Sequence, residues 1–229
     1  KNGKLSGVKL PVPDGDIADF AVVAAQADGE LSLVIVDLDA EGVTRKSVGS
    51  FDPSRSLAQI NFSDVPASLL GETGTGEAIV EKVLDRAAVL IAFEQLGGAE
   101  RAFEITKEFM LGRYAFGRPI ASFQSLKPRL ADLWCEIQLT RSNCYYGAWA
   151  LSNDADELGV AASISRIAAC KAYDLAGVEM IQLHGGVGYT WEYDCHLFYR
   201  RAKFLSVVIG NPASWKNKLV TRLQAQTAA

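Results

Sequence analysis

Two segments of the chain combine residue types that can bind a phosphate. The first reads Arg113-Tyr114-Ala115-Phe116-Gly117-Arg118-Pro119-Ile120 and is followed by Phe123-Gln124. Two arginines flank an aromatic residue and a glycine in a turn between helices, and a cationic turn beside a helix N-terminus suits a phosphate or pyrophosphate. An ordinary glycine–proline turn with solvated arginines is the alternative for this segment alone.

The second segment is rich in glycine and reads Gln182-Leu183-His184-Gly185-Gly186-Val187-Gly188-Tyr189-Thr190. Three glycines in four positions allow backbone N–H groups to approach a ligand closely. The segment is not G-x-G-x-x-G and follows a predicted helix rather than a strand, so it does not indicate a Rossmann site. A helix C-cap followed by a loop is the alternative interpretation.

Other kinds of chemistry find little support in the sequence. The two histidines, His184 and His196, and four scattered cysteines show no metal-ligand spacing. No G-x-S-x-G motif occurs, and no histidine can be paired with a nucleophile. We interpret His184 as a helix-end histidine rather than a base.

A change in composition divides the chain near residue 75. Residues 1–76 carry six Lys/Arg and eleven Asp/Glu, whereas residues 77–229 carry seventeen and sixteen and contain all four tryptophans. The polar, glycine-rich stretch at 71–76 is typical of a linker. We therefore predict a partial β-domain at 1–74 and a helical bundle domain at 75–229.

The first domain is predicted to hold four or five strands in a small antiparallel sheet or partial barrel. Two β-branched runs, 21–25 and 31–36, flank an Asp28-Gly29 turn and predict a hairpin, and 57–62 predicts a further strand. Pro11 and Pro13 indicate an edge strand or a loop.

The second domain is predicted to be an up-down four-helix bundle. Apolar residues at helical spacing predict helices over about 77–112, 122–151, 155–184 and 213–226. Gly97-Gly98 inside the first helix indicates a kink or close packing against a neighbour. The fold class is therefore α+β.

Composition excludes several classes of protein. The chain has 229 residues, 49% of them apolar, and a formal net charge of −4 without a polybasic stretch, which argues against nucleic acid as a partner. The longest uncharged runs are twelve residues, too short for a membrane span. Four widely spaced cysteines favour reduced thiols and a cytoplasmic location.

Together, the two segments resemble the C-terminal half of acyl-CoA dehydrogenases. The shared order is R-x-x-F-G-x-P-I-x-x-F-Q, then about sixty residues on Q-x-H-G-G-x-G-Y-T-x-E. Leu130-Ala131-Asp132 and Arg201-Ala202-Lys203 fall at the expected places. The opening Leu5-Ser6-Gly7-Val8-Lys9 is similar to the family's middle β-domain, so we expect a chain that lacks the family's N-terminal helical domain.

The resemblance implies a function and a set of cofactor-binding residues. It implies FAD-dependent α,β-dehydrogenation of an acyl-CoA thioester, with electron-transferring flavoprotein or a similar acceptor and a homo- or hetero-oligomer. The FAD contacts carry over to six residues: Arg113, Phe116, Gln124, Gln182, Gly185 and Gly186.

The chain departs from the family's pattern where the flavin ring and the catalytic base would lie. The usual K-x-W-I-T is replaced by Lys9-Leu10-Pro11-Val12-Pro13. The two places where the family carries its catalytic glutamate hold Ile209 and Ala87. Asp85 is on the opposite helical face from Ala87, and Glu94 is two turns away. The catalytic base is therefore unassigned.

Two other functions stay open beside an active dehydrogenase. A non-catalytic partner subunit would complete a neighbour's FAD site through the Arg113 and Gln182 segments without a competent site of its own. A helical bundle that serves only for assembly would bind neither flavin nor CoA.

Overall fold

The computed structural model describes residues 3–228, which form two compact units, one ending at Val83 and one beginning at Leu84. Residues 1, 2 and 229, the outermost residues of the two predicted domains, lie outside the described part. Helix α1 (Gly76–Gly112) begins in the first unit and continues through the second. The boundary after residue 74 thus stays a prediction.

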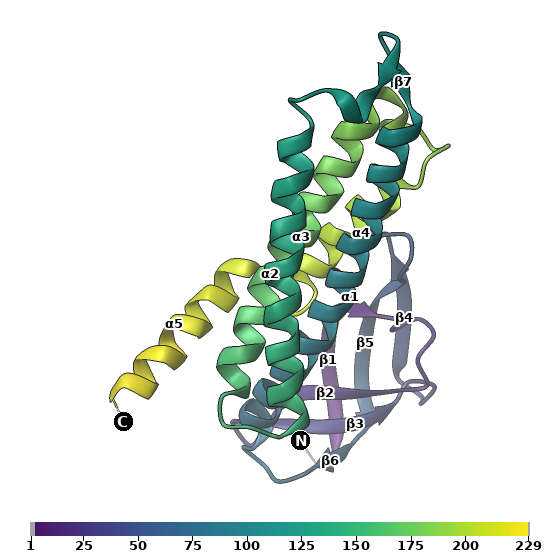
Figure 1. Cartoon of the computed structure of the whole chain (residues 1–229). Coiled ribbons are helices and arrows are strands. Elements are labelled where there is room, and N and C mark those ends of the chain that lie inside the picture. The colour runs from purple at the N-terminus through teal and green to yellow at the C-terminus, as the bar shows by residue number, and fades with distance from the viewer. Residues whose placement is uncertain (1–2, 229) are drawn as a thin grey trace. The chain divides into compact units, whose positions relative to one another are not determined.

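The first unit contains two three-stranded antiparallel sheets (Figure 1). One has the strand order β1-β5-β4 and the other β2-β3-β6. The strands are β1 (Lys4–Pro13), β2 (Phe20–Ala27), β3 (Glu30–Asp37), β4 (Val43–Val48), β5 (Leu57–Pro66) and β6 (Ser68–Leu70). The described part of this unit thus has six strands, one more than the upper bound from the sequence.

One apolar core joins the two sheets. Alternate residues of β5, namely Ala58, Ile60 and Phe62, are buried, as the period of two in a strand requires. They share a cluster with Val23 of β2 and Val36 of β3. The predicted hairpin is confirmed: β2 pairs with β3 from Phe20↔Asp37 to Ala27↔Glu30, around the Asp28-Gly29 turn.

The hairpin turn and the proline-containing edge strand, both predicted from the sequence, have the backbone geometry that their residues favour. Asp28 and Gly29 have φ values of 52° and 89°, as a two-residue hairpin turn of type I′ needs. Pro11 and Pro13 lie in β1, which is an edge strand of its sheet, where a missing N–H leaves no ladder partner unsatisfied.

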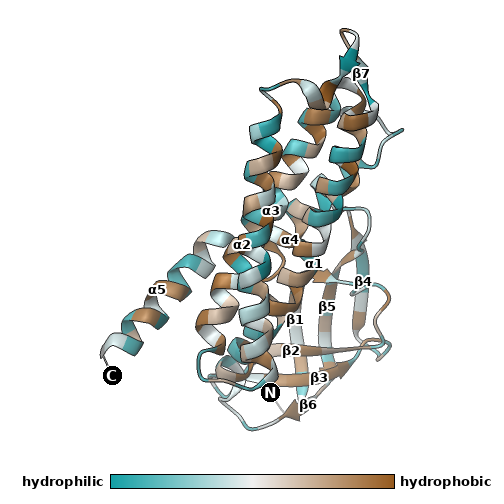
Figure 2. Ribbon diagram, in the orientation of Figure 1, coloured by the Kyte–Doolittle hydropathy of each residue, from teal (hydrophilic) through white to brown (hydrophobic). Residues whose placement is uncertain are grey.

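The second unit is helical, and Figure 1 shows α1, α2 and α3 running side by side. Besides α1, its α-helices are α2 (Lys127–Ser152), α3 (Leu158–His184), α4 (Cys195–Val207) and α5 (Pro212–Ala228). Helices α1 to α4 share one core, built largely from small residues such as Ala99, Ala176 and Ala202. Apolar and polar residues alternate along each helix, as Figure 2 shows.

The predicted α+β class is confirmed, but the described chain has five α-helices rather than four. The sequence prediction missed α4, in which only Cys195, Ala202 and Leu205 are buried, so its apolar period is weak. Helix α5 packs on the bundle through Trp215, which is 1% exposed and lies in a cluster with Ala88 and Ala162.

Two predicted helix starts were too early. Helix α2 begins at Lys127 rather than at Ser122, because Phe123 is extended and Pro128 is tolerated only in the first turn. Helix α3 begins at Leu158 rather than at Ala155. Its predicted end at His184, before Gly185, is confirmed.

Gly98 allows close packing and does not interrupt α1. A Cβ atom built there would lie 2.5 Å from Cζ of Tyr173 in α3, whereas one at Gly97 would meet nothing within 4 Å. Of the two alternatives from the sequence, close packing is confirmed for Gly98. No helix in residues 3–228 is long and apolar enough to cross a bilayer.

Candidate functional site

The arginine turn is a short β-hairpin at the end of α1. Strand β7 (Tyr114–Ala115) pairs with β8 (Arg118–Pro119), and the tip residues Phe116 and Gly117 have φ values of 54° and 77°. Arg113 joins helix to hairpin: its N–H donates to Phe109 O at 2.8 Å, and its carbonyl accepts from Ile120 N–H at 2.8 Å. Its backbone is thus fixed from both sides.

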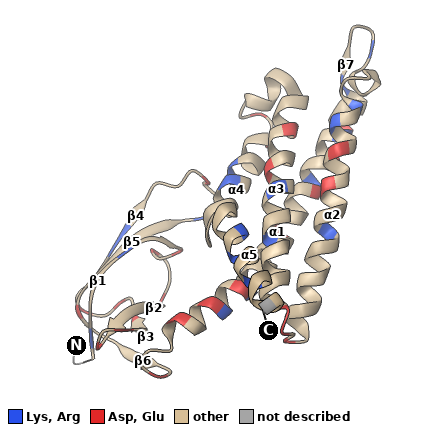
Figure 3. Ribbon diagram, turned by 90° about the vertical axis from the view of Figure 1, so that its left-hand side faces the viewer, with Lys and Arg blue, Asp and Glu red and all other residues tan. Residues whose placement is uncertain are grey.

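The tip of the hairpin presents an aromatic ring to solvent. Phe116 is 96% exposed and meets Phe123 edge to face, with 6.3 Å between ring centroids. The Arg118 guanidinium lies 4.2 Å from the centroid of the Phe123 ring. In Figure 3, the ribbon around β7 is partly blue, the colour of Lys and Arg. An exposed phenylalanine held by a type I′ turn is suited to contact another molecule.

The glycine segment is the C-terminus of α3 followed by a 3₁₀ turn, η2 (Gly185–Tyr189). Gly185 has a φ of 64°, and a Cβ at either Gly185 or Gly186 would meet nothing within 4 Å. By contrast, a Cβ at Gly188 would lie 2.5 Å from Ile181 O. The first two glycines therefore leave open backbone for a ligand, while Gly188 serves close packing.

Three of the six predicted cofactor residues line one hollow of about 220 Å³. Arg113, Gln182 and Gly185 come together there, although 69 residues separate the first two. The other lining residues are Phe109, Ile120, Leu126, Arg129, Leu183 and His184.

The other three predicted residues lie outside this hollow. Phe116, Gln124 and Gly186 are all exposed and are not among its lining residues. Phe116 nevertheless lies at the tip of the hairpin that follows Arg113, and Gly186 follows Gly185 in η2. The FAD roles of all six residues stay predictions.

His184 is buried in the wall of the hollow. It is 5% exposed, its ring stacks on Phe109 with centroids 4.1 Å apart, and its Nδ1–H donates to Met180 O at 2.7 Å. Burial lowers its pKa below 6.5, and the bond to Met180 opposes this. Its Nε2 is buried and has no hydrogen-bond partner among residues 3–228, which leaves an acceptor for a ligand.

Arg129, from the first turn of α2, is a second arginine in the wall. Its Nε and Nη2 donate to Oε2 and Oε1 of Glu179 in α3, at 2.7 and 2.9 Å. This bidentate bond raises the pKa of Arg129. Arg129 was not predicted from the sequence. The available signal was its partner Glu179, an acidic residue three positions before Gln182 and therefore on the same face of α3.

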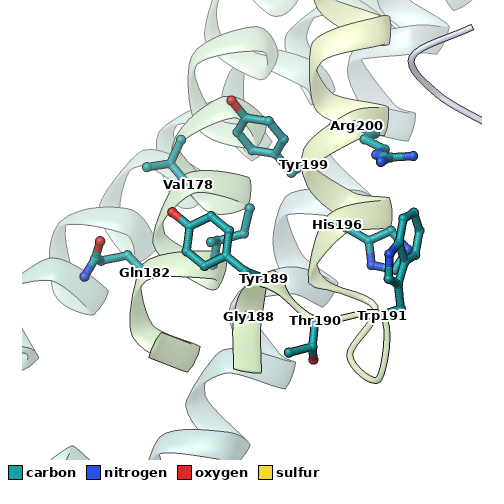
Figure 4. Close-up of a pocket in the computed structure, with 10 residues that line it drawn as sticks. Val178, Gln182, Gly188, Tyr189, Thr190, Trp191, His196, Tyr199 and Arg200 are labelled. Atoms are coloured by element: carbon teal, nitrogen blue, oxygen red, sulfur yellow. The ribbon is translucent and has the colours of Figure 1, made fainter. Parts of the chain in front are cut away.

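A second, larger hollow of about 450 Å³ lies on the other side of Gln182 along α3 and α4 (Figure 4). Tyr189 and Tyr199 form its aromatic floor. Trp191 also lines it, and its ring lies 4.4 Å from the His196 ring and 5.0 Å from the Arg200 guanidinium. His196, Tyr199 and Arg200 belong to α4, a helix that the sequence pattern did not predict, so neither motif pointed to this hollow.

Two carboxylates of α1 that flank Ala87 in the sequence, Asp85 and Glu94, are held in ion pairs. Asp85 accepts from Arg222 of α5 at 2.9 Å. Glu94 accepts from Arg201 of α4, whose Nε lies 2.9 Å away. Ile209 packs in the apolar cluster around Trp215, and its carbonyl accepts from Trp215 Nε1 at 3.1 Å. No group of His, Cys, Asp and Glu positioned for a metal ion occurs in the described part.

Comparison with known proteins identifies the family. The family model described as "Acyl-CoA dehydrogenase, C-terminal domain" matches residues 74–223. The chain belongs to the acyl-CoA dehydrogenase family. Both halves of its sequence motif, from Arg113 and from Gln182, fall inside that match.

Named members of the acyl-CoA dehydrogenase family align with nearly the whole chain. It is 35% identical over 217 residues to the acyl-CoA dehydrogenase IpdE2 of Mycobacterium tuberculosis, covering 94% of the chain and 59% of the relative. It is 32% identical over 222 residues to an acyl-CoA dehydrogenase of Bacillus subtilis, covering 92% and 58%.

A solved member of the acyl-CoA dehydrogenase family shares the fold. Butyryl-CoA dehydrogenase of Megasphaera elsdenii superposes with a TM-score of 0.91 at 27% identity, over 96% of this chain and 60% of that one. The chain thus spans about three-fifths of the length of these relatives.

Proposed function

We propose that the protein is an FAD-dependent acyl-CoA dehydrogenase subunit that acts in α,β-dehydrogenation of an acyl-CoA thioester. The observation that carries this proposal is the convergence of Arg113, Gln182 and Gly185 on one hollow. The two motifs that define the resemblance, far apart in sequence, meet at that point.

The residues around the hollow fit the diphosphate end of FAD. Arg113 supplies a charge-assisted donor, and Gly185 and Gly186 offer open backbone. With a volume of about 220 Å³, the hollow can accommodate phosphate groups but not a whole dinucleotide. The rest of the cofactor would extend past the hairpin, where Phe116 offers an exposed ring.

In this function, the chain's residues bind and orient rather than transfer protons. FAD, when bound, would supply the hydride acceptor for the substrate's β-carbon. Arg113 and the Gly185-Gly186 backbone would hold the phosphates, Gln182 lines both hollows, and burial lowers the pKa of His184 and so favours its neutral form. Holding two reactants in line accounts for much of the rate acceleration of such enzymes.

A second candidate, a non-catalytic partner subunit, is favoured by a specific observation. Ile209 and Ala87 stand where the family carries its glutamate, and the nearby Asp85 and Glu94 are engaged by Arg222 and Arg201. Such a subunit would complete the FAD site of a neighbour whose own residues supply the base.

The remaining assignments belong to the same proposal. The substrate is an acyl-CoA, and reoxidation falls to electron-transferring flavoprotein or a similar acceptor. The working form is a homo- or hetero-oligomer, which would cover exposed aromatics such as Phe116 and Trp191. The four free thiols favour a reducing compartment, the cytoplasm.

Exchange of the substrate's α-proton in D₂O separates the two candidates. The flavin-loaded protein is mixed with acyl-CoAs of several chain lengths, and deuterium at the α-carbon is followed by mass spectrometry without an electron acceptor. Exchange by the protein alone supports the dehydrogenase, whereas exchange only after a second subunit is added supports the partner role. If the protein neither binds flavin nor exchanges the α-proton, the result would support a helical bundle that serves only for assembly.

If only the carboxylate is missing, Ile209→Glu or Ala87→Glu should restore exchange. A positioned general base contributes about 10²- to 10⁴-fold, so the gain would be well above background. Ile209→Gln and Ala87→Gln are the matched controls, because they have similar size without the charge.

A further inference from the structure

Arg129 lies in the wall of the hollow that also contains Arg113, but it is not part of either sequence motif. It comes from α2, while Arg113 follows α1 and Gln182 belongs to α3. The hollow therefore receives a cationic side chain from a third helix of the bundle.

Glu179 orients the Arg129 guanidinium and leaves one edge of it free. The carboxylate accepts from Nε and Nη2 in a bidentate bond, and Glu179 is itself 9% exposed. No residue between 3 and 228 accepts a hydrogen bond from Nη1 of Arg129. A planar guanidinium bound along one edge is pre-organised to donate along the other, for which a phosphate oxygen is a favoured acceptor.

Another arginine of the same helix shows what a purely structural pair looks like. Arg141, three turns further along α2, donates from Nε and Nη2 to Glu100, at 3.1 and 2.7 Å. Its Nη1 is also used, in a bond of 3.0 Å to Gln138. The side chains of Arg129 and Arg141 are equally exposed, at 39%, so the free Nη1 of Arg129 is not a result of greater exposure.

We propose that Arg129 is a second phosphate-binding residue of this hollow, held in position by Glu179. The inference rests on the proposed function, since it takes the ligand to be the diphosphate of FAD. Arg113 supplies the net positive charge, because the charge of Arg129 is balanced by Glu179. Arg129 contributes a directed donor, and so fixes which phosphate oxygen lies against α2.

Binding of ADP to the full chain, measured by isothermal titration calorimetry, tests this role. ADP carries the diphosphate of FAD without the flavin, and inorganic pyrophosphate serves as competitor. We compare Arg129→Met with Arg141→Met, which removes a similar ion pair from the same helix. Arg113→Met reports on the proposed site as a whole.

We expect Arg129→Met to weaken ADP binding by about 3- to 10-fold, less than for an arginine without a counter-ion. Pyrophosphate should displace ADP less effectively from this variant than from the wild type. Arg129→Lys should weaken ADP binding by nearly as much as Arg129→Met. A single ammonium group cannot bind Glu179 along one edge and a phosphate along the other, as a guanidinium can. Arg141→Met should leave ADP affinity unchanged, although it should lower the free energy of unfolding by about as much as Arg129→Met does.

The outcomes distinguish this inference from the proposed function. If Arg113→Met weakens ADP binding and Arg129→Met does not, Arg129 is only a structural residue and this inference is wrong. If the folded wild-type chain binds neither ADP nor FAD, the cofactor assignment fails and the inference fails with it. A loss of affinity that is equal in Arg129→Met and Arg141→Met would also contradict a direct role.

Discussion

Arg222 in α5 donates a hydrogen bond to Asp85 in α1, with 2.9 Å between Nη2 and Oδ2. Nη1 of the same arginine donates to Gly159 O at 2.6 Å and to Ser163 Oγ at 2.9 Å in α3. One side chain thus joins the last helix to two others. It also holds the Asp85 carboxylate toward α5.

Replacing Asp85 by asparagine should lower the free energy of unfolding. The two side chains are 12% and 20% exposed, so a charge-assisted bond is lost in a mostly desolvated place, at a cost of about 1.5–3 kcal/mol. Asp154→Asn is the control, because Asp154 and Arg86 form an exposed pair worth under about 1 kcal/mol. Urea denaturation gives both values, and equal effects would contradict the argument.

The adjacent glycines of α1 should respond in opposite directions to alanine. At Gly97 a Cβ meets nothing within 4 Å, so Gly97→Ala should stabilise the helix by up to about 1 kcal/mol. At Gly98 it would lie 2.5 Å from the ring of Tyr173, which is 3% exposed and cannot easily move. Gly98→Ala should destabilise by about 1–3 kcal/mol, as overpacking does. Thermal melts of the two variants test this. If both substitutions raise the melting temperature, the Tyr173 ring can move away from the added Cβ atom at little cost.

His184 should make stability depend on pH below about 6.5. Burial lowers its folded-state pKa, so below 6.5 the unfolded chain binds more protons than the folded chain. The free energy of unfolding therefore falls as pH decreases through 6.5 toward the folded-state pKa. His184→Gln should reduce the difference in stability between about pH 7.5 and about pH 5.5. An unchanged difference in His184→Gln would mean that this imidazole is not kept neutral by the fold.

The sequence predicted those features that depend on local patterns. The β2–β3 hairpin follows from the Asp28-Gly29 turn between β-branched runs, and the end of α3 follows from Gly185 after an apolar helix. It also predicted Arg113 and Gln182 as site residues, and the structure places both in one hollow. The resemblance to acyl-CoA dehydrogenases singled out these two residues, and their FAD roles stay predictions.

Other features depend on contacts between segments that no local pattern encodes. Helix α4 was missed because only three of its residues are buried. Arg129 lines the hollow, and its ion-pair partner Glu179 lies fifty residues away in the sequence. The alternatives of a kink or close packing at Gly98 could be decided only with Tyr173 in place. Contacts between residues far apart in the sequence therefore determine such features, and local sequence patterns do not predict them.

Arg113 should be the side chain on which FAD affinity depends most. Arg113→Ala removes a charge-assisted phosphate contact and should cost about 1.5–3 kcal/mol of binding free energy. Arg101→Ala is a suitable control, because Arg101 is an exposed arginine of α1 that pairs with Glu104. Fluorescence titration with FAD measures the affinity of both variants. Equal affinities for Arg113→Ala and wild type would show that Arg113 does not contact FAD.

The most direct test of the account is the identity of any flavin that the purified protein contains. The protein is isolated with its natural partners, denatured, and the released cofactor is separated chromatographically from FMN and riboflavin standards. We expect FAD, which should be lost or strongly reduced in Arg113→Ala and retained in Arg101→Ala. A folded, colourless protein that takes up no added FAD, or one that releases only FMN, would contradict it.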